Sequence, residues 1–353
     1  MLSSNILSEA KDLSRTSATN RDGPVSKLTH NYEDFMAQAI PRRRAETAAV
    51  REHMLWGRIP VSWLYLLPAL VFFVGWQVYP ILRVGWLSLT DYYFLKDDGN
   101  GTWVGLKNYR EAFSDPLVRQ GLWRAAKFTA LFLPGMIFLP MVLAVMVDRY
   151  RNPKVATFLR LVLLIPAMIP GPLVFVLWKW MYDLYIGPIN YFLVDVFGLF
   201  TLYNQPQWLG DKQLVFPAIA VMAWWWGLGY HTMFYLAGLA TIPRDLYEAA
   251  KVDGANEWSL FWNVTFQRLR PVILVLVVLR FGTAMAAIDE FIILGGGAGN
   301  MDRPTFTWTV YMRALAFEVG DWHQSYAAAV GWIGTFAMLI VVIGMFRLFR
   351  SRD

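Results

Sequence analysis

Long apolar runs separated by shorter polar segments are the dominant pattern along this chain. The hydrocarbon core of a bilayer is about 30 Å thick, and a helix that crosses it needs roughly 20 apolar residues. Six runs come close to that length and predict membrane-spanning helices at 59–82, 128–147, 161–178, 214–242, 271–294 and 324–346. Prolines interrupt several runs, but neighbouring helices of a membrane bundle can satisfy the carbonyl groups that a proline leaves free. The pattern therefore predicts an all-α, polytopic membrane protein.

Composition supports a membrane protein and excludes several kinds of site. Of the 353 residues, 56% are hydrophobic and only 16% are charged, whereas an ordinary soluble domain is about half apolar and about a quarter charged. The chain has no cysteine, so disulfides and thiolate metal sites are excluded. It has neither a G-x-x-x-x-G-K-[ST] loop nor an H-E-x-x-H pattern. We therefore expect no catalytic residues, no metal site, no cofactor and no ATP hydrolysis in this chain.

The positions of lysine and arginine predict the orientation. The segments 148–156 and 243–270 and the C-terminal "RLFRSRD" are basic, whereas 183–213 and 295–322 contain few cations. Because positive loops stay in the cytoplasm, both termini and the segment 243–270 are predicted to be cytoplasmic. The net charge of +6 is thus interpreted as a topology signal, and we expect no nucleic-acid partner.

Three regions are predicted along the chain. Residues 1–58 are polar and lack a hydrophobic period, so we expect a cytoplasmic and largely disordered tail, with a basic cluster at 42–44. Residues 59–121 are predicted to hold the first membrane helix and an external loop. Residues 122–353 are predicted to form the core domain.

The polar segment 243–270 carries its own helix signals. Pro243 suits the first turn of a short helix, "RDLYEAAKV". Gly254 permits the turn that ends it, and Asn256 can cap a second helix, "EWSLFWNVTFQRL". Such a unit can project from the bilayer into a groove of a soluble partner. Taken alone, the residues slightly favour a simpler alternative, an interfacial loop whose tryptophans lie among lipid headgroups.

The stretch "EAAKVDGANEWSLFWNVTFQRLRP" resembles the EAA loop of type I ABC importer permeases. The family pattern is E-A-A, then D-G-A, then an aromatic-rich stretch and a Leu-Pro element. The matching positions, which the resemblance marks as contacts for an ATPase subunit, are Glu248, Ala249, Ala250, Asp253, Gly254, Ala255 and Phe261. Trp262 completes the aromatic pair, and Pro271 matches the later proline. Gln267 departs from the pattern, because the family usually has proline there.

Other segments resemble sugar-importer permeases of the maltose and glycerol-3-phosphate type, in particular the first of the two permeases. They include "LLPALVFFVGWQVYPILRVGWLSLTDY" and "LGGGAGNMDRPTFTWTVYMRALAF". The resemblance implies a six-helix subunit of a binding-protein-dependent importer for a sugar or related polyol, in the plasma membrane of a bacterium or archaeon. Implied partners are a second permease, two cytoplasmic ATPase subunits that bind ATP and Mg²⁺, an external solute-binding protein and membrane lipid. The segment 248–262 would couple this chain to the ATPase.

Three ionisable residues fall in the predicted fifth span. Arg280 lies about nine residues into it, roughly 13 Å along a helix, where a charge is costly and usually faces a cavity or a partner. Arg280 has two possible roles: contact with a polar substrate, or an ion pair with a neighbouring subunit. Asp289 and Glu290 lie near the outer end of the span, where solvated carboxylates are the simpler alternative to a place on the substrate path.

The "WWW" at 224–226 and His231 are the other conspicuous side chains of the predicted fourth span. Successive helical residues point about 100° apart, so the three indoles cannot form one platform for a sugar. Packing or lipid contact is the simpler expectation, with Trp225 the candidate for the substrate path. His231 is expected to be a structural polar residue.

Two other classes of protein compete with the importer. An ion-coupled secondary transporter could use Arg280, Asp289 and Glu290, but it predicts an inverted internal repeat and gives no role to 248–262. A membrane-embedded enzyme would need a convergent set of His, Asp or Ser on the spans, which the sequence does not offer.

Overall fold

The computed structural model describes residues 54–55, 59–96, 101–297, 301–320 and 322–350. These residues belong to two compact units, 1–80 and 81–353. The predicted tail 1–58, with its basic cluster at 42–44, lies outside the described residues except for 54–55. Its disorder and its place in the cytoplasm stay predictions.

The first unit contains a two-stranded antiparallel pair and a long apolar helix. Strands β1 (Met54–Leu55) and β2 (Ile59–Pro60) pair with Met54 opposite Pro60. Helix α3 (Val61–Phe73) continues into one π-helical turn, η1 (Val74–Val78). The run from Trp63 to Leu87 is long and apolar enough to cross a membrane, so the first predicted span is present and ends five residues later than predicted.

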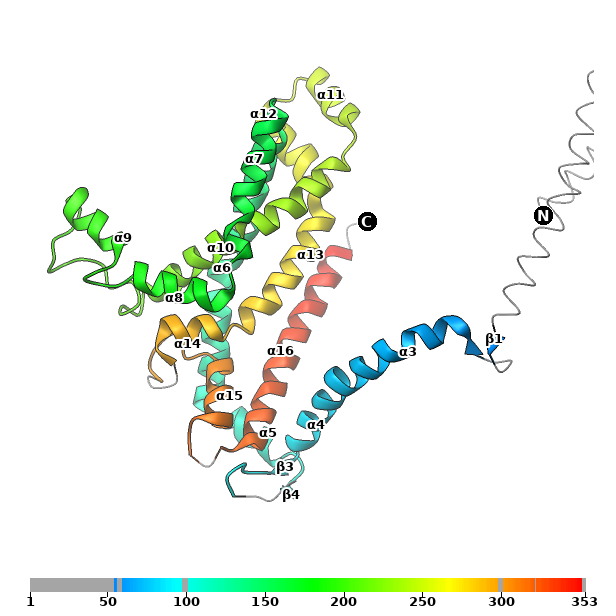
Figure 1. The fold of residues 1–353 in the computed structure, drawn as a ribbon, viewed down its shortest axis with the longest axis vertical. Coiled ribbons are helices and arrows are strands. Elements are labelled where there is room, and N and C mark those ends of the chain that lie inside the picture. Colours follow the sequence, from blue (N-terminus) through cyan, green and yellow to red (C-terminus); the bar gives the residue numbers. More distant parts are fainter. Residues whose placement is uncertain (1–53, 56–58, 97–100, 298–300, 321, 351–353) are drawn as a thin grey trace, which may run out of the picture. The chain divides into compact units, whose positions relative to one another are not determined.

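The second unit is mostly helical (Figure 1). Helix α4 (Tyr79–Leu87) crosses the boundary between the two units. The N-terminal part of the second unit then comprises the antiparallel strands β3 (Thr90–Asp91) and β4 (Thr102–Trp103), and α5 (Lys107–Ser114). The central part comprises α6 (Pro116–Asp148), α7 (Pro153–Leu164), η2 (Pro166–Met168), α8 (Gly171–Met181), α9 (Pro188–Tyr191), η3 (Phe192–Val196) and α10 (Val215–Ala240). The C-terminal part comprises α11 (Arg244–Val252), α12 (Glu257–Leu260), η4 (Phe261–Thr265), α13 (Phe266–Met285), α14 (Asp289–Gly295), α15 (Trp308–Phe317) and α16 (Gln324–Arg350).

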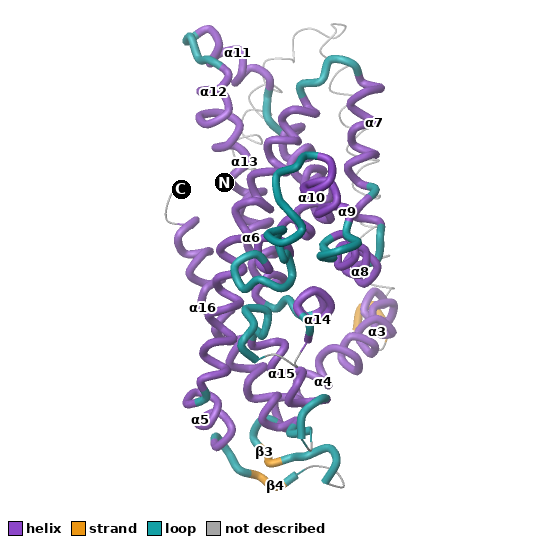
Figure 2. Tube along the Cα trace, turned by 90° about the vertical axis from the view of Figure 1, so that its left-hand side faces the viewer, coloured by secondary structure: helices purple, strands orange, loops and turns teal. Residues whose placement is uncertain are grey.

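Figures 1 and 2 place α11 and α12 at one end of this unit and α5, β3 and β4 at the other. Helix α6 packs against α10, α13 and α15 along its length. The segments 91–121 and 243–270 thus lie at opposite ends of the unit, and their sides of the membrane stay a prediction.

Two large apolar clusters hold the helices of the second unit together. One joins α6, α8, α10 and α14 around Phe128, Met222 and Phe291. The other joins α6, α10 and α13 around Met141 and Tyr235, toward the end that carries α11. Gly229 lets α10 approach the end of α7 so closely that a Cβ atom there would overlap the carbonyl of Leu163.

The predicted count of six spans is not confirmed. By length and composition, three helices of the described residues can cross a membrane, or five if each of two bent helix pairs is one span. Helix α10 coincides with the predicted fourth span and has 26 residues, but it is outside that set. Its Trp, Tyr, Gly and His residues lower its mean hydropathy.

The predicted third span, 161–178, is not one continuous helix. It falls across α7, η2 and α8, and the two halves meet at 92°. Pro166 and Pro170 have no N–H to donate, and Ile169 takes the extended conformation that a residue before proline prefers. The sequence holds both prolines, but it does not give the size of the bend.

The predicted fifth span, 271–294, has wrong boundaries. Its helix already begins at Glu257, ends at Met285, and is followed at 50° by the separate helix α14. Asp289 and Glu290 therefore lie in the first turn of a new helix, where the dipole favours negative charge.

Candidate functional site

The first helix of the candidate coupling loop has the bounds that the sequence predicted. Helix α11 spans Arg244–Val252, and Pro243 immediately precedes its first residue. Glu248, Ala249 and Asp253 are exposed, whereas Ala250 and Ala255 are half-buried. Glu248 forms no hydrogen bond or ion pair with the other described residues, so its carboxylate is open to solvent or to a partner. The resemblance did not mark Val252, an apolar side chain that is 88% exposed at the end of this helix.

A hydrogen-bonded turn ends α11. Gly254 has φ +81°, in the left-handed region that glycine adopts without strain. Its N–H donates to the carbonyl of Lys251 at 3.0 Å, and the N–H of Ala255 donates to the carbonyl of Ala250 at 2.9 Å. This pair of bonds is a Schellman motif, which satisfies the last carbonyls of a helix. The turn is thus fixed by the backbone of the loop itself.

The second helix of the loop continues into the membrane domain. Asn256 caps it, because its side-chain oxygen accepts from the Ser259 N–H at 2.8 Å, as predicted. The helix then passes through the π-helical turn η4 and into α13 without a break. At the position where the family usually has proline, the Gln267 amide donates to the Trp262 carbonyl at 3.2 Å. The helix continues past Gln267 without a break.

Two contacts attach the loop to the bundle, and a third holds its two helices together. Phe261, one of the predicted coupling residues, packs with Tyr247 against the apolar cluster of α6, α10 and α13. The Tyr247 hydroxyl lies 3.0 Å from the Thr265 hydroxyl, which joins α11 to η4. Arg149, just after α6, forms an ion pair with Glu257 at the start of α12. The Arg149–Glu257 ion pair was not predictable, because its partners lie far apart in the sequence.

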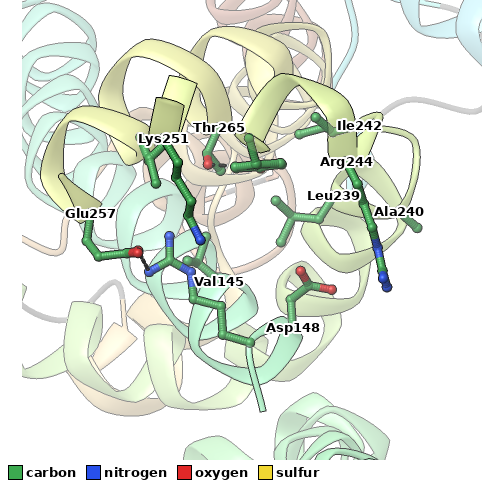
Figure 3. A pocket seen from close by; sticks show the side chains of 12 residues that line it. Val145, Asp148, Leu239, Ala240, Ile242, Arg244, Lys251, Glu257 and Thr265 are labelled. Carbon is green, nitrogen blue, oxygen red and sulfur yellow. Dashed lines mark hydrogen bonds and ion pairs between the residues drawn. The ribbon is translucent and has the colours of Figure 1, made fainter. Parts of the chain in front are cut away.

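Figure 3 shows the pocket that these attachments enclose between α11, α12 and the ends of α6 and α10. Its volume is about 680 Å³. Its charged lining residues are Asp148, Arg149, Arg244, Lys251 and Glu257. A second groove of about 500 Å³ lies at the turn and is lined by Ala250, Asp253, Gly254, Ala255, Asn256, Ser259, Asn263 and Val264. Four of the predicted coupling positions thus line one concave surface.

Inside the helical bundle, Arg280 contacts His231. Arg280 lies on α13 and is half-buried, whereas His231 on α10 is fully buried. The Arg280 Nε–H donates to His231 Nε2, and His231 Nδ1 lies 2.6 Å from the Gly227 carbonyl. His231 is thus the structural polar residue that the sequence predicted. Arg280 makes no hydrogen bond or ion pair with Asp289 or Glu290, so the structure does not assemble the charged set that an ion-coupled transporter would need.

The three tryptophans of α10 point to different neighbours, as the helical spacing predicted. Trp224 donates its indole N–H to the Phe132 carbonyl at 2.8 Å, and Trp226 donates to the Ile169 carbonyl at 3.1 Å. Trp225 is 37% exposed and packs beside Trp178, with 5.6 Å between ring centroids. Only Trp225 of the three therefore remains a candidate for the substrate path. Asp289, the third candidate, is exposed at the start of α14.

Sequence reasoning missed a polar cluster at the opposite end of the unit. Asp115 caps α6 by accepting from the Leu117 N–H at 2.7 Å, and its other oxygen accepts from the Tyr311 and Tyr326 hydroxyls at 2.8 and 2.9 Å. Burial and the nearby carboxylate raise the pKa of Tyr311. The cluster joins α6, α15 and α16. The only sequence signal is an aspartate before Pro116.

No group of three or more His, Cys, Asp or Glu side chains suited to a metal ion occurs in the part of the chain that the structure describes. The arrangement offers an exposed helical loop at one end of the unit and a half-buried arginine hydrogen-bonded to a histidine inside it.

Comparison with protein families decides between the competing classes. Residues 136–352 match the family described as "binding-protein-dependent transport system inner membrane component". The chain belongs to this family. It is therefore a permease of a binding-protein-dependent ABC transporter and an inner membrane component, not an enzyme. The prediction of a type I ABC importer permease is confirmed.

Curated relatives match most of the permease. It is 30% identical over 295 residues to the sulfoquinovosyl glycerol transport system permease SmoG of Agrobacterium fabrum, covering 82% of this chain and 90% of the relative. It is also 30% identical over 297 residues to the lactose transport system permease LacF of Rhizobium radiobacter, covering 83% and 94%.

A solved structure shares the fold of the permease. It contains a bacterial alginate ABC transporter in complex with an alginate pentasaccharide-bound periplasmic protein, and one of its chains matches with a TM-score of 0.70. The sequence identity is 20%, and the match covers 84% of this chain and 97% of that chain. The all-α fold class of an ABC importer permease is thereby confirmed.

Proposed function

We propose that this permease forms half of the path of an importer for a sugar or related polyol, and that its loop 243–270 couples the path to cytoplasmic ATPase subunits. A second permease, two ATPase subunits that carry ATP and Mg²⁺, and an external solute-binding protein complete the complex. The relatives named for lactose and sulfoquinovosyl glycerol support this class of solute. The structure with a periplasmic protein supports the external partner.

The coupling proposal is carried by one observation: α11 and its turn are exposed at their tip and fixed at their base. Glu248, Val252 and Gly254 are exposed, and the exposed side chains can enter a groove of an ATPase subunit. Phe261 and Tyr247 pack the base against the bundle, and the Tyr247–Thr265 contact joins α11 to η4. A movement of the ATPase would then be transmitted to the membrane domain through the continuous helix formed by α12 and α13.

In the proposed cycle, ATP binding brings the two ATPase subunits together and moves the coupling helices with them. The helix Glu257–Met285 tilts in response, because it has no break at which the motion could be lost. The permeases switch from inward-facing to outward-facing, and the solute arrives from its binding protein. Arg280, Trp225 and Asp289 are the proposed contacts on the solute path.

The absence of cysteine makes a direct test available, since one introduced thiol is the only one in the chain. Val252→Cys places it on the coupling helix, and Tyr203→Cys places it in loop 183–213, where Tyr203 is fully exposed. We expect a membrane-impermeant maleimide to label Val252→Cys only in inside-out vesicles and Tyr203→Cys only in right-side-out vesicles. Binding of the ATPase should protect Val252→Cys alone. Labelling of both from the same side, or no protection, would contradict the proposal.

The transport assay separates the importer from its competitor. We expect proteoliposomes with all subunits and the binding protein to take up solute only with ATP. Uptake by this chain alone on an ion gradient would instead favour the secondary transporter.

A further inference from the structure

The positive charge of Arg280 has no counter-ion among the residues that the structure describes. Arg280 lies in the interior of the membrane domain, where an unpaired charge is costly. Its one recorded side-chain partner is His231, which binds the Nε–H. The terminal nitrogens of the guanidinium, with four N–H groups, have no acceptor in the described parts of the chain. A purely structural arginine would be expected to face a carboxylate.

The hydrogen bonds of His231 establish that it is neutral. The Gly227 carbonyl can only accept, so His231 Nδ1 carries a proton. The Arg280 Nε–H can only donate, so His231 Nε2 carries none. A neutral ring holds the guanidinium in position without cancelling its charge. The pair His231–Arg280 is therefore a positioned cation rather than an ion pair.

The surroundings of Arg280 are partly exposed and suit binding of a solute better than a buried contact with another side chain. Tyr230, which interacts electrostatically with Arg280, is 48% exposed, and Trp225 is exposed on the same helix. The nearest acidic residues along the chain, Asp289 and Glu290, lie beyond the bend that follows Met285 and do not contact it. A planar guanidinium with free terminal nitrogens binds carboxylate, sulfonate or phosphate groups through two parallel hydrogen bonds.

We propose that the solute of this permease carries an acidic group, and that Arg280 binds this group in the membrane. The acidic group is a carboxylate, sulfonate or phosphate on the sugar or polyol. His231 acts as a positioning residue that orients Arg280. This inference rests on the proposed function, because it needs a complete importer.

The test uses the whole complex in liposomes and compares matched solutes. Each pair consists of a neutral sugar and the same sugar carrying a carboxylate, a sulfonate or a phosphate. ATP-dependent uptake and solute-stimulated ATP hydrolysis are measured for the original chain and for Arg280→Gln, Arg280→Lys and His231→Gln. The control is Arg119→Gln, which removes one charge from an exposed position at the outer end of α6. Co-purification of all subunits is checked for each variant.

We expect the acidic sugar of one pair to be transported and the matching neutral sugar to be transported poorly. Arg280→Gln should lower uptake of the acidic solute by about 10-fold or more, since charge-assisted bonds are lost. Arg280→Lys should retain an intermediate rate of uptake, because the ammonium group keeps the charge but cannot form the two parallel hydrogen bonds of a guanidinium. His231→Gln should raise the apparent KM more than it lowers kcat, and Arg119→Gln should leave both unchanged.

The negative outcomes are distinguishable. Transport of a neutral sugar that Arg280→Gln leaves unchanged would overturn the inference and leave the proposed function intact. Loss of the second permease from the Arg280→Gln complex would also overturn it, since Arg280 would then form an ion pair between subunits. ATP-independent uptake, or no association with an ATPase, would defeat the proposed function itself.

Discussion

The coupling loop and the interior around α10 satisfy their polar groups in different ways. In the loop, the bonds made by Gly254, Ala255 and Ser259 reach partners no more than five residues away. Around α10, Trp224 bonds to a carbonyl 92 residues away, and His231 bonds to Arg280, 49 residues away. The loop is a local unit attached at its base, whereas the interior exists only when several helices are assembled. Changes in the loop should therefore affect coupling, and changes at the close contacts between helices should affect folding.

The largest expected effect is at the contact between α10 and α7. Gly229→Val should prevent close packing, because even a Cβ atom there overlaps the Leu163 carbonyl. Overpacking of this kind costs about 1–3 kcal/mol or more, and we expect little folded protein by size-exclusion chromatography. Gly282→Ala is the matched control, since a Cβ there meets nothing within 4 Å. Equal yields for both variants would contradict the proposed packing.

Gly254→Val should reduce transport strongly while leaving the spans folded. A β-branched residue at φ +81° is strained by roughly 1–2 kcal/mol, and it would displace the tip of α11. We expect at least a tenfold loss of ATP-dependent uptake and weaker co-purification of the ATPase. The control is Gly198→Val, at φ +61° in loop 183–213 with nothing within 4 Å. If both variants lose transport equally, backbone strain rather than coupling explains the loss.

A pH-dependent effect is expected at the end of the unit opposite the coupling loop. His323 packs between the rings of Tyr93 and Tyr326, and burial lowers its pKa although Asp91 lies 3.3 Å away and opposes the shift. The unfolded chain takes up the proton near the usual pKa of about 6.5, so protonation favours unfolding. Stability should be full above that pH and fall as the pH drops below it. Thermal unfolding of His323→Gln should lose this pH dependence.

The smallest effect is expected for the Arg149–Glu257 pair. Both side chains are well exposed, at 45% and 65%, so the pair should contribute only about 0.2–1 kcal/mol. Arg149→Glu and Glu257→Arg should each lower coupled ATP hydrolysis slightly, and the double reversal should restore it. High salt should weaken the difference. A double variant no better than the singles would show that the pair does not join α6 to the loop.

The sequence predicts most of what is local. The bounds of α11, the left-handed Gly254 and the Asn256 cap follow from residue types within one turn of each other. The apolar runs around Pro166–Pro170 and before Asp289 were predicted, but their bends were not. An apolar run contains no information on the angle between two helices. The Arg280–His231 bond and the Asp115 cluster needed the assembled bundle, since their partners lie on other helices.

The unbroken helix from Glu257 to Met285 carries both Arg280 and the second half of the coupling loop. At 1.5 Å per residue, Glu257 and Arg280 are about 35 Å apart along its axis. If the position of this helix sets both the affinity of the permease for its solute and the affinity of the ATPase for nucleotide, the two affinities are linked reciprocally. Whatever factor nucleotide binding imposes on solute affinity, the solute must impose on nucleotide affinity. A solute lodged in the membrane would then be sensed by an ATPase that never touches it.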